Sequence, residues 1–490
     1  MNIVQAMDHR EVFRPLFRDV ETWRSWKVFL SGLEGIGLEG KEDEELFHKC
    51  TGLDSVPKLR AREAYVIAGR RSGKSFISAL IAVYLGCFKD WGSYLAPGER
   101  GWIFIIANDR PQAKIVKGYI SAILSEVKQL RSLVVKDMVE EIELKNQVSI
   151  GIKTCNFRTV RGYTLLAAVC EELAFWRSEE SANPDKEVLA AVRPSLATIP
   201  ESLLIGISTP YARKGVLYEN WKRHYGEEEG PLIWKAATKI MNPLIDEKVI
   251  KQAYEDDAQA AAAEWDAEWR TDIEDFISEE LIDAAVIPSR FEVPRQKEIN
   301  YFGYIDPSGG RHDSMTLAIA HKEKSNGKEG KVIHDCSREA RSPFTPSIVI
   351  EDFSSVLKSY GIKRISSDRY AGEFVSEGFR SNGIAVKNSE LTASEIYGVF
   401  LPMLTNSQVE LLDIKRLRVQ LQNLERRTRT GGKDLITHPP GALDDVANAA
   451  AGACVLAKKK KRKGRVFGGG RSTMPDVDIT EKFRSGLFKD

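Results

Sequence analysis

Short apolar runs that end in polar residues recur along the first half of the chain. They lie at residues 64–68, 101–107, 165–170 and 203–207. Near-continuous apolar runs of this length are typical of strands buried on both faces of a sheet. Helical patterns follow the first two runs, beginning at residue 77 and spanning residues 112–130. Alternating strands and helices predict an α/β fold with a parallel central sheet, whose strand ends meet at one edge.

A second pattern begins at residue 300. It predicts strands at residues 301–305, 315–321, 331–335, 362–367 and 409–412, a helix over 345–360 and a last helix from about residue 443. The order is three strands, a helix, a strand, further helices with one more strand, and a final helix. This is the order of an RNase H-like nuclease, so we expect a second α/β domain here.

Two regions lack strand patterns. Residues 1–60 look helical, and Trp23, Trp26, Phe29 and Leu30 share a helix face that suits the core, with packing against adenine as the alternative. Residues 211–290 are more polar and predict a mostly helical lid or linker without obvious chemistry.

The turn after the first strand carries the clearest chemical motif. Residues 69–73 (GRRSG) precede Lys74 and Ser75 at the start of a helix. Backbone N–H groups of such a turn and the positive end of the helix together bind phosphate. Ala68 stands where the GxxxxGK(S/T) motif begins with glycine, and alanine still permits a tight turn. The predicted ATP-binding residues are Gly69, Arg71, Ser72, Gly73, Lys74 and Ser75, with the Ser75 hydroxyl on Mg²⁺.

Polar residues end the third and fourth strands. Glu171 is expected to bind Mg²⁺ through its water shell, and Glu172 is expected to orient the attacking water. Ser208 and Thr209 are expected to sense the γ-phosphate and pass its loss to a neighbouring segment. Arg70 is a candidate for stabilising charge on the transferring phosphoryl group, although an arginine in such a turn can also be merely solvated.

Aspartates mark corresponding places in the second half. Asp306 follows its first strand, Asp368 its fourth, and Asp444 and Asp445 begin its last helix. Carboxylates gathered from distant elements can hold two Mg²⁺ or Mn²⁺ ions for cleavage of a phosphodiester. Asp445 is preferred to Asp444 because it shares a helix face with Asn448. The alternative is that these residues are ordinary loop and helix-capping aspartates.

Composition describes a soluble protein of two or three domains. The 490 residues are 42% hydrophobic and 29% charged, and the apolar runs are too short to span a bilayer. The net charge is +1, of which residues 458–465 contribute +7, so the rest of the chain carries −6. Six cysteines without metal spacing suit a reducing compartment, and no signal peptide opens the chain. We expect a cytoplasmic protein.

Taken together, the motifs resemble those of the large terminase subunit of tailed bacteriophages over roughly residues 20–455. They are the phosphate loop at 69–75, the acid pair at 171–172, Ser208-Thr209-Pro210, Asp306-Pro307-Ser308-Gly309-Gly310, Ser367-Asp368-Arg369-Tyr370, and residues 438–449 with the Asp444-Asp445 pair. Two positions depart from the family pattern. Glu171 stands where aspartate is commoner, and Leu443 stands where relatives often have histidine.

The resemblance implies an N-terminal P-loop ATPase and a C-terminal RNase H-like nuclease. The expected division is 1–60 for the helical part of the ATPase domain, 61–272 for its core and lid, 273–298 for a linker, 299–457 for the nuclease domain and 458–490 for a basic flexible tail. The tail is expected either to contact DNA or portal or to be a solvated end.

The implied activity is ATP-driven translocation of double-stranded DNA into a procapsid, with endonucleolytic cutting of concatemers. The implied partners are the portal protein, the small terminase subunit and further copies of the chain in a ring, in the host cytoplasm. The same resemblance implies that Arg70 acts on the γ-phosphate. Three alternatives stay open: a helicase or translocase without a nuclease, a resolvase-type nuclease gated by ATP, and a non-catalytic capsid or scaffold protein.

Overall fold

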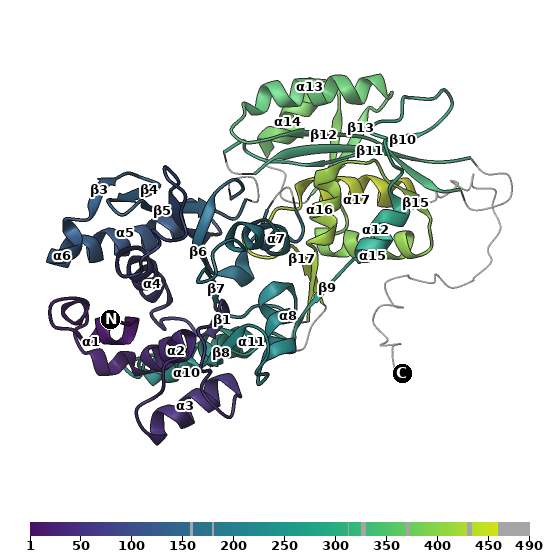
Figure 1. Cartoon of the computed structure of the whole chain (residues 1–490). Helices are drawn as coiled ribbons and strands as arrows, with labels where there is room; N and C mark the ends of the chain where they lie inside the picture. Colours follow the sequence, from purple (N-terminus) through teal and green to yellow (C-terminus); the bar gives the residue numbers. More distant parts are fainter. Residues whose placement is uncertain are drawn as a thin grey trace, which may run out of the picture. The chain divides into compact units, whose positions relative to one another are not determined.

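A computed structural model describes residues 1–156, 160–178, 181–311, 313–324, 330–368, 373–428 and 434–458 (Figure 1). Arg369, Tyr370 and the basic tail beyond Lys458 lie outside these ranges. No helix among the described residues is long and apolar enough to cross a membrane. Within the same ranges the six cysteines are free thiols, five of them buried.

The apolar runs of the first half build an eight-stranded sheet in the order β3-β4-β5-β2-β6-β7-β1-β8. Its strands are β1 (Glu63–Ala68), β2 (Gly101–Ala107), β3 (Val134–Asp137), β4 (Glu141–Leu144), β5 (Val148–Thr154), β6 (Thr164–Glu171), β7 (Leu203–Ser208) and β8 (Leu232–Ala236). The neighbours from β5 to β8 run parallel, whereas β3 and β4 add an antiparallel edge. The predicted parallel central sheet is therefore confirmed.

Both faces of this sheet are buried, which explains the continuous apolar runs. Along β1, Ala64, Val66 and Ala68 pack into one core cluster, and Tyr65 and Ile67 pack into another on the opposite face. Side chains alternate between the two faces of a strand, so a strand covered on both sides needs apolar residues at every position.

The helices of the first half accompany this sheet, and all but the last two contribute side chains to its two cores. They are α1 (Ile3–Asp8), α2 (Arg24–Glu34), α3 (Lys41–Thr51), α4 (Lys74–Phe88), α5 (Arg110–Glu126), α6 (Lys128–Arg131), α7 (Pro184–Leu196), α8 (Gly215–His224), α9 (Thr238–Met241), α10 (Glu247–Asp256) and α11 (Ala258–Asp266). Trp26, Phe29 and Leu30 of α2 are buried, in agreement with the predicted core face. Trp23 precedes α2 and packs against Phe76 with ring centroids 5.3 Å apart.

The region read as a mostly helical lid or linker contains more strand than its sequence indicated. β8 pairs parallel with β1 at the edge of the large sheet, although its five residues lie among polar segments. β9 (Ile273–Asp275) pairs antiparallel with β16 (Glu425–Arg427), which in turn pairs with β17 (Leu435–Thr437). Short strands of three to five residues offer too few alternations to be recognised without their partners.

The second half forms a six-stranded sheet in the order β14-β13-β10-β11-β12-β15. Its strands are β10 (Tyr301–Asp306), β11 (Met315–Lys322), β12 (Val332–Ala340), β13 (Arg364–Ser367), β14 (Ala385–Asn388) and β15 (Val409–Glu410). β10, β11 and β12 form an antiparallel meander, and β13 pairs parallel with β10. The first five strands therefore lie in the order third, second, first, fourth, fifth, and the predicted RNase H-like fold is confirmed.

Two groups of helices cover the two faces of this sheet (Figure 1). α13 (Pro346–Ser359) and α14 (Glu373–Ser381) pack on one face, and the other face receives α12 (Glu279–Ala285), α15 (Ala393–Thr405), α16 (Lys415–Gln422) and α17 (Asp445–Lys458). This topology places the ends of β10 and β13 next to each other, because the two strands are parallel neighbours. Asp306 and Asp368 are thus delivered to the same sheet edge.

Candidate functional site

The phosphate loop turns sharply between β1 and α4. Arg71 and Gly73 both have left-handed backbone, with φ of 60° and 80°. A Cβ at position 73 would lie 2.6 Å from the Trp23 ring, so this position requires glycine for space as well as for conformation. The Trp26 indole N–H donates to the carbonyl of Ser72 at 2.6 Å. The N-terminal helical residues therefore brace the loop.

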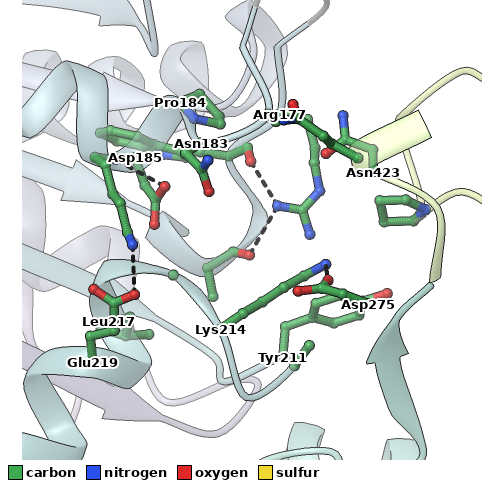
Figure 2. Close-up of a pocket in the computed structure, with 18 of the residues that line it drawn as sticks. Arg177, Asn183, Pro184, Asp185, Tyr211, Lys214, Leu217, Glu219, Asp275 and Asn423 are labelled. Carbon is green, nitrogen blue, oxygen red and sulfur yellow. Dashed lines mark hydrogen bonds and ion pairs between the residues drawn. The ribbon is translucent and has the colours of Figure 1, made fainter. Parts of the chain in front are cut away.

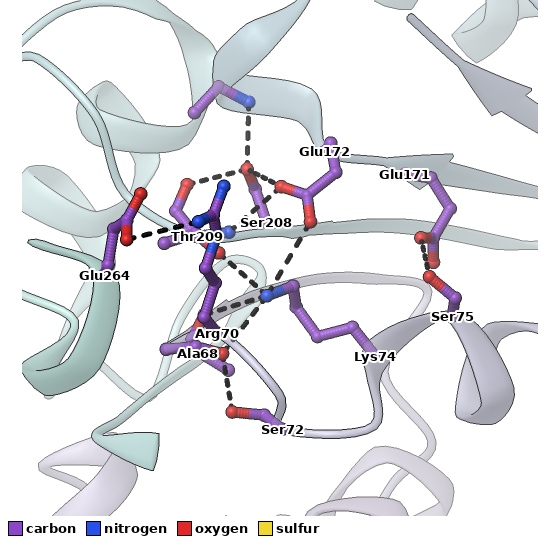
Figure 3. A network of polar contacts seen from close by, with 12 residues as sticks. Ala68, Arg70, Ser72, Lys74, Ser75, Glu171, Glu172, Ser208, Thr209 and Glu264 are labelled. Atoms are coloured by element: carbon purple, nitrogen blue, oxygen red, sulfur yellow. Dashed lines mark hydrogen bonds and ion pairs between the residues drawn. The ribbon is translucent and has the colours of Figure 1, made fainter. Parts of the chain in front are cut away.

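Lys74 is held inside the loop by oxygen atoms. Its side chain is 7% exposed, and Nζ donates to the carbonyls of Ala68 and Gly69 at 3.2 and 3.1 Å and to the Thr209 hydroxyl at 2.8 Å. Nζ also lies 3.7 Å from Oε1 of Glu172 (Figure 3). Lys74 therefore joins the phosphate loop to the ends of β6 and β7, which the sequence places more than 90 residues further along.

The two acids that end β6 point to different partners. Glu171 is fully buried and accepts hydrogen bonds from the hydroxyls of Ser75, at 3.0 Å, and Ser78. Glu172 adopts left-handed backbone with φ of 49°, which is uncommon for a residue with a side chain. This backbone turn directs Glu172 away from Ser75 and toward Lys74, as Figure 3 shows.

Glu172 lies against the end of β7. Its Oε2 accepts from the Ser208 hydroxyl at 3.3 Å and from the Thr209 backbone N–H at 3.4 Å. The Ser208 hydroxyl also donates to the Thr209 carbonyl at 2.7 Å. The structure thus brings together four residues with different predicted roles. Lys74 is predicted to bind ATP and Glu172 to orient the attacking water, and Ser208 and Thr209 are predicted to sense the γ-phosphate.

Glu171 and Ser75 form the part of this site that suits a divalent cation. Burial raises the pKa of Glu171 to about 7, against the lowering effect of the Ser78 hydroxyl, and the charge of Glu172 raises it further. A cation near the carboxylate would favour its ionised form and offset the burial. A carboxylate and a hydroxyl are hard oxygen ligands of the kind that Mg²⁺ prefers, so these residues fit the predicted ion.

The two loop arginines are exposed, and one of them has a partner. Arg70 Nη1 lies 3.3 Å from Oε2 of Glu264, a residue of α11 that the sequence analysis assigned no chemistry. Both residues line a cavity of about 310 Å³ together with Glu172 and Thr209. The loop arginine and the predicted hydrolytic acid therefore share one cavity.

The second group of acids gathers where β10, β13 and α17 meet. Asp306 Oδ2 accepts from the Asn448 side-chain amide at 2.9 Å, which joins β10 to α17. Asp444 Oδ2 accepts from the Tyr397 hydroxyl at 2.9 Å, and Asp444 Oδ1 lies 3.7 Å from Nε2 of His438. Asp368, Asp444 and Asp445 lie close enough to Asp306 for their charges to raise its pKa.

Asp306, Asp444 and Asp445 have raised pKa values. Burial raises the pKa of Asp306 well above its usual range, and the charges of Asp445, Asp444 and Asp368 add to the effect. Burial also raises the pKa of Asp445 to about 6, with further contributions from Asp444 and Asp313. Such shifts arise where like charges crowd together out of water.

A divalent cation suits the chemistry of these donors, although the described residues do not form a complete metal-binding centre. Oδ2 of Asp445 is buried without a hydrogen-bond partner among the described residues. An unpartnered buried carboxylate oxygen among other acids is the kind of group that a cation satisfies. Across the described ranges, however, no three His, Cys, Asp or Glu side chains are arranged to hold a metal ion. The metal-binding roles of Asp306, Asp368, Asp444 and Asp445 therefore stay predictions.

Four residues near the acid group around Asp306 were not predicted as site residues from the sequence. Tyr397 and His438 contact Asp444, Asn448 contacts Asp306, and Asp313 lies near enough to raise the pKa of Asp445. The sequence did give an indication for Asn448, because it lies three residues after Asp445 and so shares a helix face with it. No such indication pointed to Tyr397, since it reaches the site only through the packing of α15 against α17.

A separate cavity of about 370 Å³ is lined by none of the predicted site residues (Figure 2). Several of its charged groups have partners within the protein. Lys214 Nζ lies 2.6 Å from Oδ1 of Asp275, and Asp185 Oδ2 accepts from the Val216 N–H at 2.7 Å. Arg177 donates to the carbonyl of Trp176 at 2.7 Å. These contacts join the cavity walls to one another, while Nε of Arg177 is buried without a hydrogen-bond partner among the described residues.

Comparison with solved structures finds similarity to large terminases at low identity. No protein-family model and no curated protein matches this chain. The large terminase of bacteriophage HK97 is 14% identical with a TM-score of 0.38, over 92% of this chain and 99% of that one. The large terminase of a thermophilic bacteriophage, in complex with ADP, is 12% identical with a TM-score of 0.35, over 80% and 93%.

The large terminase nuclease of thermophilic phage G20c with bound magnesium is 14% identical with a TM-score of 0.31, over 37% of this chain and 96% of that one. These structures belong to the family that the sequence motifs indicate. Their scores are too low to transfer residue roles, so the function is argued below from this chain's own residues.

Proposed function

We propose that this chain is a DNA-packaging motor with its own nuclease. ATP hydrolysis in the first half would drive double-stranded DNA into a procapsid, and a two-metal endonuclease in the second half would cut concatemeric genomes. The observation that carries the proposal is the pair of acid groups on two sheets of one chain, one wrapped around Lys74 and the other around Asp306. A translocase without nuclease activity does not require the acid group around Asp306.

The first group supports ATP turnover as well as binding. A site that only senses nucleotide needs the loop, Lys74 and a cation. Here Glu172 is additionally held by Ser208 and Thr209 beside Lys74, with its carboxylate on the cavity shared with Arg70. A carboxylate so placed can accept a hydrogen bond from the attacking water and orient it. Mg²⁺, when bound at Ser75 and Glu171, would neutralise charge on the phosphates.

The second group supports phosphodiester cleavage. Asp306, Asp368 and Asp445 would hold Mg²⁺ or Mn²⁺, which supply an activated water and stabilise the leaving oxygen. The side chains of this chain do the positioning: Asn448 fixes one oxygen of Asp306, and Tyr397 fixes one oxygen of Asp444. With one oxygen fixed, the other oxygen of each carboxylate has a defined direction.

The proposed partners follow from the same role. They are double-stranded DNA, a portal protein, a small terminase subunit and further copies of this chain assembled as a ring on the procapsid, in the host cytoplasm. A helicase without nuclease activity and an ATP-gated nuclease are the alternatives. A scaffold protein would leave both acid groups without a purpose.

The test measures ATP hydrolysis and plasmid cleavage with the same purified protein. Asp368→Ala is expected to abolish Mg²⁺- or Mn²⁺-dependent cleavage while ATP hydrolysis continues. Cleavage that is indifferent to Asp306→Ala and Asp368→Ala would favour the helicase alternative, with a contaminating nuclease. Loss of both activities together in Asp368→Ala would contradict two separate catalytic groups.

A further inference from the structure

The helix α11 approaches the phosphate loop closely enough to take part in its chemistry. Residue 69 must be glycine here, because a Cβ would lie 2.7 Å from the Trp265 carbonyl at the end of α11. The Arg70 N–H donates to the carbonyl of Glu264 at 2.5 Å, and the Thr238 hydroxyl donates to the Arg70 carbonyl at 2.8 Å. The backbone of Arg70 is thus fixed on both sides by segments that follow the large sheet.

The Arg70 side chain is far less restrained than its backbone. Its guanidinium is 63% exposed and makes an ion pair of 3.3 Å with Glu264, which is 37% exposed. Exposed ion pairs of this kind contribute little to stability, since water competes for both charges. Lys74 differs from Arg70 in exposure and in partners, because it is buried and donates hydrogen bonds to three oxygens. Arg70 is the exchangeable cation of the site and Lys74 the fixed one.

The cavity beside Arg70 makes an exchange of partners possible. Its lining includes the carboxylates of Glu264, Glu172 and Asp109, and Arg70 is its cationic residue among the described lining positions. A γ-phosphate that enters this space brings more negative charge than a carboxylate does, and it presents three oxygens to a planar guanidinium. It would therefore compete with Glu264 for Arg70. A nucleoside diphosphate has no γ-phosphate and would leave the pair intact.

We infer that Glu264 is the positioning residue of Arg70: its carboxylate holds the guanidinium at the edge of the hydrolytic cavity and releases it to the γ-phosphate of a triphosphate. The exchange removes a contact between α11 and the loop when ATP binds and restores it when only ADP is left. α11 thereby responds to the nucleotide through the ion pair of Arg70 with Glu264, which Figure 3 shows. This inference rests on the proposed function, because it requires the loop to bind ATP.

The ratio of ATP affinity to ADP affinity tests the exchange. Both dissociation constants are measured by titration of the full chain with fluorescent ATP and ADP analogues in Mg²⁺. Glu264→Gln removes the competing charge, so we expect ATP to bind about threefold more tightly, as for loss of a weak ion pair, and ADP to bind as before. The matched control is Glu268→Gln, which removes another acid near the end of α11 that pairs with Lys235 at 2.6 Å.

A double-variant comparison separates competition from a general effect on the loop. In the Arg70→Ala background there is no guanidinium to release, so Glu264→Gln is expected to leave the affinity ratio unchanged. An equal change of ATP and ADP affinity in Glu264→Gln, or the same shift with Arg70 absent, would overturn the inference and leave the proposed function standing. If the wild-type chain binds neither nucleotide, or if Lys74→Ala binds both as tightly, the proposed function fails and the inference fails with it.

Discussion

The acid group around Lys74 and the acid group around Asp306 differ in how fully their carboxylates are paired. Around the phosphate loop, each acid has a partner within the protein: Glu171 accepts from two serine hydroxyls, and Glu172 faces Lys74 and the end of β7. Around Asp306, two acids also have partners, since Asp306 accepts from Asn448 and Asp444 accepts from Tyr397. Neighbouring acids nevertheless raise the pKa of Asp306, and Oδ2 of Asp445 is buried without a partner among the described residues. The acids of the first group are all paired within the protein, whereas the second group keeps one buried carboxylate oxygen without a partner among the described residues.

This difference has a physical consequence for each site. A polar network whose members satisfy one another is rigid before the substrate arrives. Carboxylates crowded without cations raise one another's pKa and stay protonated in part. If the proposed functions hold, we expect the group around Lys74 to depend on individual contacts, and the group around Asp306 to depend on ion binding in its stability as well as in its activity.

The largest effect is expected from Lys74→Ala. Loss of the buried cation is expected to reduce ATP hydrolysis roughly 10²–10³-fold, the usual result of removing one preorganised charge from a phosphoryl-transfer site. Metal-dependent plasmid cleavage is expected to persist. The control is Lys235→Ala, which removes a cation paired with Glu268 outside the loop. Hydrolysis that survives Lys74→Ala would show that the loop is not the hydrolytic site.

Asp306→Asn should show the reverse pattern. We expect plasmid cleavage to fall roughly 100-fold, about 3 kcal/mol in activation free energy, with ATP hydrolysis within twofold of wild type. Asp434→Asn is the matched control, since Asp434 is a half-exposed acid 3.8 Å from Arg426. Equal losses of cleavage in both variants would mean that charge in general matters and not the acid group at β10.

Ser78→Ala tests whether the ATPase group depends on single contacts. Its hydroxyl donates to the fully buried Glu171, and an unsatisfied buried acceptor costs about 1–3 kcal/mol. We expect a lower midpoint of thermal unfolding and weaker ATP hydrolysis, with unchanged plasmid cleavage. Ser125→Ala, which removes an exposed hydroxyl on α5, is the control. An unchanged midpoint would mean that Glu171 finds another partner.

The smallest effect concerns pH and the acid group. The folded pKa of Asp445 is raised to about 6 from 3.8, so its stabilising contribution is complete below the unfolded pKa and is lost as pH rises through about 6. In metal-free buffer at pH 7 to 8, Asp445→Asn is therefore expected to be more stable than wild type by about 1 kcal/mol, allowing for its partial exposure.

Near pH 4 the advantage of Asp445→Asn should disappear, because the wild-type carboxyl is then protonated in the folded state. Thermal unfolding with and without Mg²⁺ completes the test. Mg²⁺ is expected to raise the midpoint of wild type more than that of the variant. A variant that is less stable than wild type at pH 8 without metal would contradict the crowding of the carboxylates.

Sequence alone determined the fold class and the order of its parts. The apolar runs at 64–68, 101–107, 165–170 and 203–207 became β1, β2, β6 and β7, because strands buried on both faces must be apolar throughout. The order of the later strands likewise matches the second sheet. Local motifs also predicted site residues at Lys74, at the acids that end β6 and at the aspartates of β10 and α17, since each lies at the end of a recognisable element; their roles stay predictions.

Tertiary structure decided how these residues meet. The left-handed backbone of Glu172 separates it from Glu171, and no local pattern announces that turn. Glu264 reaches Arg70 across 194 residues, and Tyr397 reaches Asp444 across 47. Contacts of this kind depend on how helices pack against a sheet. Periodicity within one segment encodes which face of that segment is apolar, and it carries no information about which distant side chain will lie opposite.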